Sequence, residues 1–439
     1  MFTRQSFVAL QHRNYRLLWI GLFVSFSGSM MQNAALLWHV SLLVPPDRKG
    51  LALGLVGLVR VVPIMVFSMI SGVVADAWDR RKLMLFTQIA ATIVAGVLAL
   101  LTFRGLTQVW PIYVLAALGS AVGAFDLPAR GALVPTLVPR EHLPNAISLN
   151  TIMFQTASVV GPSLGGVLIA STGVGWVYVA NAVSFFFVIV ALLLMRDVPA
   201  HPTSAGGARD EVSLHAAMEG LRFVFRSPLI RSTMLLDFFA TFFSSATALL
   251  PIFAQDVLQV GARGYGWLYA APAVGAMATS AVLVSISDRI ERRGETLLWA
   301  VAGYGLATVV FGFSRSFWLT FACLMLTGAT DTVSMVIRNI VRQLETPDRL
   351  RGRMMGVNMV FFMGGPQLGE LEAGAVANWL GAPFSVISGG IGCLIATGWV
   401  AAATPALRGY RRHVENTEKM EKTEKAEKAE KTEKAETTV

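Results

Sequence analysis

The chain has 439 residues, of which 54% are hydrophobic and only 14% are charged. Charged residues make up about a quarter of soluble globular proteins, so this composition excludes an ordinary soluble domain and indicates a membrane protein. The net charge of +9 does not predict nucleic acid as a partner, because the excess of Lys and Arg lies in short loops between apolar runs. Both cysteines, Cys323 and Cys393, lie inside apolar runs, so neither disulfides nor a metal site is predicted.

A basic segment, residues 2–16, precedes the first apolar run and is predicted to lie at the membrane surface. About twelve apolar runs follow, each near the ~20 residues that a helix needs to cross a bilayer. Lipid admits only helices or closed barrels, and these runs are too long for barrel strands. We therefore predict an all-α membrane protein with 12 transmembrane helices, at approximately 17–43, 51–75, 82–103, 110–134, 144–171, 174–195, 229–257, 265–287, 295–313, 317–344, 353–378 and 383–404.

The loops on the side of the N-terminus hold about 22 Lys and Arg residues, and the opposite loops hold about five. This asymmetry predicts that both termini are cytoplasmic, and we expect the bacterial inner membrane. The predicted parts are a first six-helix bundle (1–196), a cytoplasmic linker (197–228), a second bundle (229–407) and a disordered Glu/Lys-rich cytoplasmic tail (408–439).

The end of the linker carries apolar residues at helical spacing beside two arginines. This pattern predicts an amphipathic helix on the inner leaflet. A helix that binds a partner protein is the alternative. The residues are Leu214, Met218, Leu221, Phe225, Arg222 and Arg226.

A loop pattern of acid, two residues, acid, Arg, Arg occurs twice. It begins at Asp76 between the second and third runs, and at Asp288 between the eighth and ninth. This repetition predicts two pseudo-symmetric bundles of six helices.

Two motifs resemble signatures of the major facilitator superfamily. The segment 72–81 is similar to its loop signature G-x-x-x-D-x-x-G-R-[RK], although Asp79 stands where Gly is usual. The segment 161–166 is similar to its antiporter motif GP-x-x-GG, although Ala157 replaces the usual preceding Gly. An Arg-x-x-Gln-Gly element in the fourth span is missing. The chain is most similar to the enterobactin-exporter-like secretion and efflux branch. This resemblance implies alternating-access transport and a helix-packing role for Gly161, Pro162, Gly165 and Gly166.

Charged residues near the repeated loop predict a gate at the cytoplasmic side. Arg80 is expected to reach a carboxylate in the fourth span, and its equivalent in the second half is expected to reach one in the tenth. An ion pair that recurs in both halves favours gating over substrate binding. Arg130 and Arg338 can instead pair with the acid on their own helix. The gating candidates are Asp76, Arg80, Asp126, Asp288, Arg292 and Asp331.

Glu370 and Glu372 place two carboxyl groups in the eleventh apolar run, without counterparts in the first half. Apolar surroundings favour the protonated form of a carboxyl group, so these residues are candidates for proton coupling. The superfamily places the second and eleventh spans face to face, which implies an outer ion pair between Arg60 and Glu370. A permanent structural ion pair and a direct substrate contact are the alternatives.

The superfamily lines its substrate cavity mainly with the first, fourth, seventh and tenth spans. Gln32 and Asn33 belong to a polar stripe in the first span, for which helix packing is the alternative. Asp237 and Phe243 lie in the seventh span, and a structural ion pair is the alternative for Asp237. A cavity with aromatic residues and few charges favours a large, partly apolar solute.

The chain has no G-x-x-x-x-G-K-[ST], H-E-x-x-H or G-x-S-x-G motif. An enzyme is therefore not predicted, and neither are catalytic residues or a cofactor. We predict a monomeric secondary active transporter, a proton-coupled antiporter that exports a small amphipathic, siderophore-like or drug-like molecule. Its expected partners are the solute, protons and the lipid bilayer. An importer or passive facilitator of the same fold is the alternative.

Overall fold

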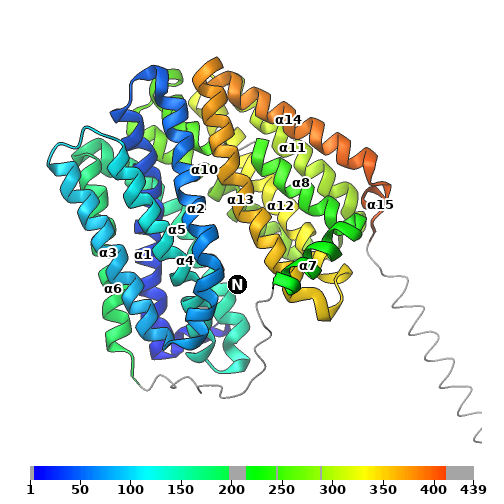
Figure 1. Ribbon diagram of the computed structural model, residues 1–439, viewed down its shortest axis with the longest axis horizontal. Coiled ribbons are helices and arrows are strands. Elements are labelled where there is room, and N and C mark those ends of the chain that lie inside the picture. The colour runs from blue at the N-terminus through cyan, green and yellow to red at the C-terminus, as the bar shows by residue number, and fades with distance from the viewer. Residues whose placement is uncertain (1–3, 197–213, 244–245, 287–288, 412–439) are drawn as a thin grey trace, which may run out of the picture.

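The computed structural model describes residues 4–196, 214–243, 246–286 and 289–411. Within these ranges the regular elements are helices, and no strand occurs. The long helices form two bundles that lie side by side (Figure 1). The prediction of an all-α membrane protein built from two six-helix bundles is therefore confirmed.

The first bundle consists of six helices. In it, α1 packs on α5 and α6, and α4 packs on α2 and α3. The Asp79 carboxylate accepts from the backbone N–H groups of Arg81 and Lys82, at 2.9 and 3.2 Å, and so caps the start of α3. Short 3-10 turns at Arg4–Gln11, Pro46–Arg48, Val134–Thr136 and Arg140–His142 precede or join the helices. The helices are α1 (Arg13–Leu43), α2 (Lys49–Ala77), α3 (Arg80–Phe103), α4 (Trp110–Leu133), α5 (Leu143–Thr172) and α6 (Val174–Leu194).

The second bundle repeats this arrangement, with α12 between α10 and α11, and α14 against α8 and α11. A glycine with positive φ stands at the same place in each bundle: Gly173 (φ 91°) separates α5 from α6, and Gly381 (φ 88°) separates α13 from α14. The elements are α8 (Pro228–Phe243), α10 (Gly261–Ile286), α11 (Arg293–Phe313), α12 (Phe317–Glu345), α13 (Asp348–Leu380), α14 (Ala382–Ala403) and the short α15 (Pro405–Arg408).

The seventh span is not the single helix predicted at 229–257. After α8, the chain forms a 3-10 turn (Ala246–Leu249), a short α9 (Leu250–Ile252) and a π-helical turn (Phe253–Val257). Pro251 lies within this stretch, and proline interrupts the regular hydrogen bonding of a helix.

Eleven segments in the described part of the chain are long and apolar enough to cross a membrane. The limits of the corresponding helices agree with the predicted spans to within a few residues, except in the seventh span. The remaining predicted span, the eleventh at 353–378, corresponds to α13, a 33-residue helix that packs between α2, α8 and α14. Its sequence is more polar because it begins with several arginines and contains Glu370 and Glu372.

We call the end of the molecule that carries the N-terminal segment and the α2–α3 loop the basic end, and the opposite end the far end. One apolar core at the far end includes buried residues of both bundles, among them Leu36, Val56, Phe253, Tyr265 and Ala373. At the basic end each bundle has its own core. The ribbons of the two bundles also diverge toward the basic end (Figure 1). The bundles are therefore packed together at the far end.

The linker contributes helix α7 (Leu214–Arg226), which packs on α13 and α8 at the basic end (Figure 1). The rest of the linker, 197–213, and the predicted Glu/Lys-rich tail from residue 412 onward lie outside the described residues.

Candidate functional site

The two bundles meet where glycines let helix backbones touch. At the crossing of α2 and α13, a Cβ on Gly374 would lie 2.7 Å from Cα of Gly54. At the crossing of α5 and α10, a Cβ on Gly166 would lie 2.8 Å from Cα of Gly266. Small residues permit such close approach of membrane helices. The two halves therefore meet at two similar crossings, both toward the far end.

The GP-x-x-GG segment lies at helix contacts on two sides. A Cβ on Gly161 would lie 2.5 Å from the carbonyl oxygen of Ser27 in α1, and one on Gly165 would lie 2.7 Å from Cγ of Met31. The Pro162 carbonyl oxygen is 2.5 Å from a Cβ built on Gly266 of α10. The motif thus faces α1 within its own bundle and α10 across the interface.

Glu370 takes the place of Gly166 in the equivalent segment of α13, and it lies at the α2 crossing. Its Oε2 atom is buried, with no hydrogen-bond partner among the described residues. A Cβ on Gly57 would lie 2.8 Å from this oxygen. The structure therefore places a carboxyl group of the second bundle directly against a helix of the first.

Arg60 lies one turn beyond Gly57 and close enough to Glu370 for the two charges to interact. Among the described contacts, however, Arg60 donates to Asn33 Oδ1 of α1, at 3.2 Å, and forms no ion pair with Glu370. The expected direct ion pair is thus absent in this conformation, because the guanidinium group is held within its own bundle. Glu372 is half-buried, and its role in coupling stays a prediction.

Aromatic residues surround this region, and the sequence analysis missed them. The Tyr265 hydroxyl donates to the Ala34 carbonyl oxygen, at 2.8 Å, and its ring packs on Trp38. Tyr265 and Tyr269 of α10 both interact electrostatically with Arg60. Their spacing of four residues on one face of an apolar span was the available signal.

The other residues predicted to bind substrate lie apart from one another. Gln32 accepts a hydrogen bond from Asn181 Nδ2, at 2.8 Å, inside the first bundle. Phe243 stacks on Phe239 and packs against Gly392 of α14. The four predicted substrate residues therefore do not form one cluster, since Asn33 contacts Arg60 and Asp237 belongs to a separate network.

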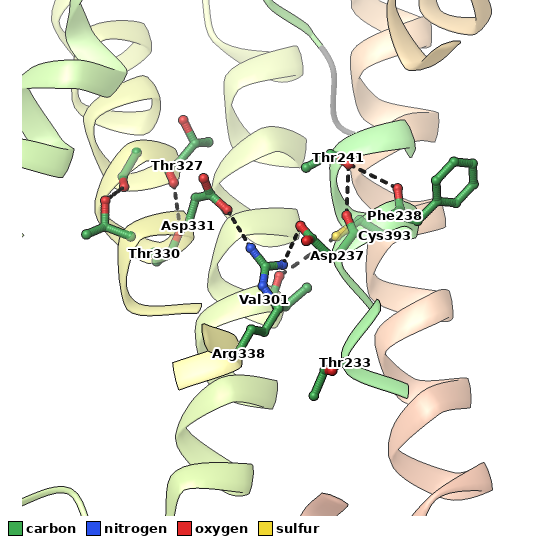
Figure 2. A network of polar contacts seen from close by, with 12 residues as sticks. Thr233, Asp237, Phe238, Thr241, Val301, Thr327, Thr330, Asp331, Arg338 and Cys393 are labelled. Atoms are coloured by element: carbon green, nitrogen blue, oxygen red, sulfur yellow. Dashed lines mark hydrogen bonds and ion pairs between the residues drawn. The ribbon is translucent and has the colours of Figure 1, made fainter. Parts of the chain in front are cut away.

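A buried network of charges joins α8 to α12 (Figure 2). Arg338 lies between two carboxylates, 2.9 Å from Asp237 Oδ1 and 3.3 Å from Asp331 Oδ1. Arg342 pairs with the other oxygen of Asp237, at 3.2 Å, and also donates to the Thr233 carbonyl oxygen. The side chains of Arg338 and Asp237 are 3% and 4% exposed, whereas that of Asp331 is 46% exposed. The charges of the two acids and the two arginines balance, and Asp331 is the member of this network that is accessible to solvent.

The first bundle has a related but smaller network. Asp126 pairs with Arg130 of the same helix, at 3.5 Å, and accepts from Thr87 and Gln88 of α3 at 2.9 and 2.8 Å. The guanidinium of Arg130 lies 4.3 Å from the ring centre of Phe26. These residues line a cavity of about 280 Å³ between α1, α3, α4 and α6.

The gating candidates have different partners in this conformation. Arg80 donates to the Ala132 carbonyl oxygen, at 3.0 Å. Arg292 pairs with the exposed Glu295, at 3.4 Å. The expected pairing of Arg292 with Asp331 is not formed, because Asp331 lies near the middle of α12 and is held by Arg338. The Asp76 side chain and Asp288 lie outside the described part, and the gating roles stay predictions.

The family described as transmembrane secretion effector matches residues 4–434. The enterobactin exporter EntS of Shigella boydii serotype 18 is 28% identical over 402 residues, covering 91% of this chain and 94% of that protein. EntS of Escherichia coli O1:K1 is 27% identical over the same coverage.

Solved structures share the fold at low sequence identity. A bacterial homologue of the human lysosomal transporter Spinster, in an inward-facing unoccupied conformation, superposes with a TM-score of 0.70 at 14% identity, covering 90% of this chain and 98% of that one. A bacterial homologue of the iron transporter ferroportin, also inward-facing, gives 0.65 at 15% identity, covering 91% and 99%. These likenesses establish the shared architecture.

Proposed function

Because the chain belongs to the transmembrane secretion effector family of the major facilitator superfamily, we propose that it is a proton-coupled antiporter exporting a small amphipathic molecule. That the chain is a multi-pass membrane transporter and not an enzyme follows from this membership and from its relatives. The proposal concerns the coupling ion, the direction of transport and the solute. Its relatives are named as exporters of enterobactin, which supports a siderophore-like or drug-like solute.

The charge distribution supports the orientation that export requires. Cytoplasmic loops carry more Lys and Arg than external ones, so we assign the basic end and both termini to the cytoplasm of a bacterial inner membrane. The shared core at the far end then corresponds to a closed outer side. In this conformation the protein would accept its solute from the cytoplasm, and rocking of the two bundles would expose the solute to the outside.

The position of Glu370 is the single observation that carries the proton-coupling proposal. Its buried Oε2 has no partner among the described residues and lies at the α2 crossing, with Arg60 one turn away. In its charged form Glu370 attracts Arg60 across the interface and favours the closed far end. Protonation removes this attraction, so less free energy is needed to separate α2 from α13. A proton taken up at one side thereby changes the preferred conformation.

A transport screen tests the proposal in cells. The chain is overproduced in a bacterium that lacks its own efflux pumps, and accumulation of siderophores and amphipathic drugs is measured with and without a protonophore. We expect at least one compound to be depleted from the cells only when the proton gradient is intact. Depletion that persists with the protonophore would indicate an energy source other than the proton gradient. Equilibration of the solute without depletion would indicate a passive facilitator, and accumulation above the empty-vector control would indicate an importer.

A further inference from the structure

Helix α7 leaves one apolar face uncovered. On its packed side, Val224 is only 1% exposed and contacts Ile230, Met234 and Met354. On the other side, Met218 is 64% exposed and Phe225 is 49% exposed. When an amphipathic helix lies at the end of a membrane bundle, lipid can cover such an apolar face.

A groove continues from Phe225 onto the surface of the second bundle. It has a volume of about 350 Å³ and lies between the end of α7, the start of α8 and the end of α14. Most of its lining is apolar. The lining residues are Phe225, Arg231, Ser232, Leu235, Trp399, Val400, Ala403 and Thr404.

The groove opens on the side of α14 that faces lipid. Ile391, Ile395 and Trp399 follow one another at intervals of four residues and are 44%, 67% and 55% exposed. Such a row of uncovered apolar side chains on a membrane helix contacts acyl chains. The groove lies where α8 begins and α14 ends, which corresponds to the depth of lipid headgroups.

The charges around the groove are positive. Arg222, Arg226 and Arg231 are exposed, whereas Glu219, the acid in the described side chains of α7, is already paired with Arg353 of α13. Among the described residues that line the groove, none is acidic. An anionic headgroup would therefore meet guanidinium groups that have no acidic partner among the described residues, and a guanidinium group can donate two hydrogen bonds to the oxygens of one phosphate.

We propose that the groove binds one anionic phospholipid of the leaflet at the basic end. One acyl chain lies along Leu235, Trp399 and Ala403, and the phosphate contacts Arg231, with Arg222 and Arg226 beside it. This occupant agrees with the apolar lining of the groove, its opening toward lipid, its depth at the level of the headgroups and the positive charge around it. Because Phe225 lines both the groove and the exposed face of α7, the lipid also holds the linker helix against the second bundle.

Native mass spectrometry of the full-length protein tests the proposal. The protein is purified in detergent and mixed with phosphatidylglycerol or phosphatidylcholine, and retained lipids are counted. We expect one phosphatidylglycerol to be retained in preference to phosphatidylcholine. R231Q should weaken its retention about fivefold, the contribution of one basic residue at an anionic leaflet. A403F should abolish retention by filling the groove.

Two matched variants control for charge and bulk. R140Q removes an exposed arginine at the basic end of the first bundle, and A402F adds the same ring one residue away from the groove lining. Both should retain the lipid as the wild type does. Equal retention of the two lipids, or unchanged retention in R231Q and A403F, would overturn the proposal. A dimer that forms without bound lipid and is disrupted by A403F would also overturn it. Displacement of the lipid by free glycerol phosphate at equal concentration would do the same.

Discussion

Gly54 of α2 and Gly374 of α13 cross backbone to backbone: a Cβ on Gly54 would lie 3.1 Å from Cα of Gly374, and one on Gly374 would lie 2.5 Å from the Gly50 carbonyl oxygen. No side chain separates the bundles at this point. The closed far end therefore depends on residues without a Cβ, and it can be disturbed by a single methyl group.

The variant G374A tests this dependence. The added methyl group meets backbone atoms that cannot rotate away, so we expect the packed far end to be destabilised by about 1–3 kcal/mol. Thermal unfolding in detergent measures the loss. G364A is the matched control, because a Cβ on Gly364 meets no atom within 4 Å. Equal melting temperatures for the two variants would contradict the tight crossing.

Glu370 should make the far end sensitive to pH. The charged carboxylate attracts Arg60, so the far end is closed at higher pH and opens as falling pH protonates Glu370. Spin labels at the exposed positions Leu51 and Trp379, introduced as L51C and W379C in a C323A/C393A background, report the distance. We expect this distance to increase on acidification in the wild type and to be long and pH-independent in E370Q.

E372Q provides the comparison for this experiment. It neutralises the neighbouring acid on the same helix and should leave the pH response intact. A response that is lost in E372Q and retained in E370Q would transfer the coupling role to Glu372. A response that is unchanged in both variants would exclude this pair of acids.

The Asp237 network should be important for stability, in contrast to the surface pair Arg292–Glu295. D237N leaves two buried arginines with one acid, and breaking a buried ion pair costs about 3–5 kcal/mol. R292Q breaks a pair whose side chains are 63% and 41% exposed, and such pairs contribute about 0–1 kcal/mol. Thermal unfolding of both variants checks the difference. A mild effect of D237N would instead favour a direct role in substrate binding.

Tyr410 lies beyond the last span, and its ionisation should lower the stability of the folded protein at alkaline pH. Its hydroxyl donates to Glu345 at 3.1 Å, and burial together with this carboxylate raises the pKa of Tyr410 to about 12. The neutral phenol is thus favoured in the folded protein. Its stabilisation is complete below the usual tyrosine pKa of about 10 and is lost as pH rises toward 12.

Unfolding of Y410F as a function of pH tests this limit. Phenylalanine cannot ionise, so the variant should be less stable at neutral pH and should lose less stability in the alkaline range. The difference between the two proteins should therefore narrow as pH rises. A constant difference across that range would contradict the assignment.

Span limits and the two-bundle fold could be predicted because long apolar runs and the repeated loop are properties of the sequence itself. The pairing of Asp331 with Arg338 could also be predicted from the sequence, since both lie on one helix. The contacts of Asp237 with Arg338 and Arg342 could not be predicted from the sequence, because they depend on how α8 and α12 are rotated about their axes. The second arginine, four residues after the first, was the signal available for that cluster.

The hydrogen bond of Arg60 to Asn33 could not be predicted from the sequence for a similar reason. Opposite charges on facing spans suggested Glu370 as the partner, but the apolar pattern does not show that Asn33 of α1 lies within hydrogen-bond distance of Arg60. Likewise, no local pattern indicated that the seventh span changes its winding after α8, although Pro251 marks the region.

That change of winding has a consequence for the contacts between the two bundles at the far end. The π-helical turn carries Gln255 and Asp256, which contact Ser41 and Lys49 of the first bundle. A π turn accommodates one extra residue relative to an α-helix, so rewinding it by one residue would withdraw both side chains while α8 keeps its position. The contacts of Gln255 and Asp256 at the far end could thus be released by a local change in the seventh span, without movement of a whole bundle.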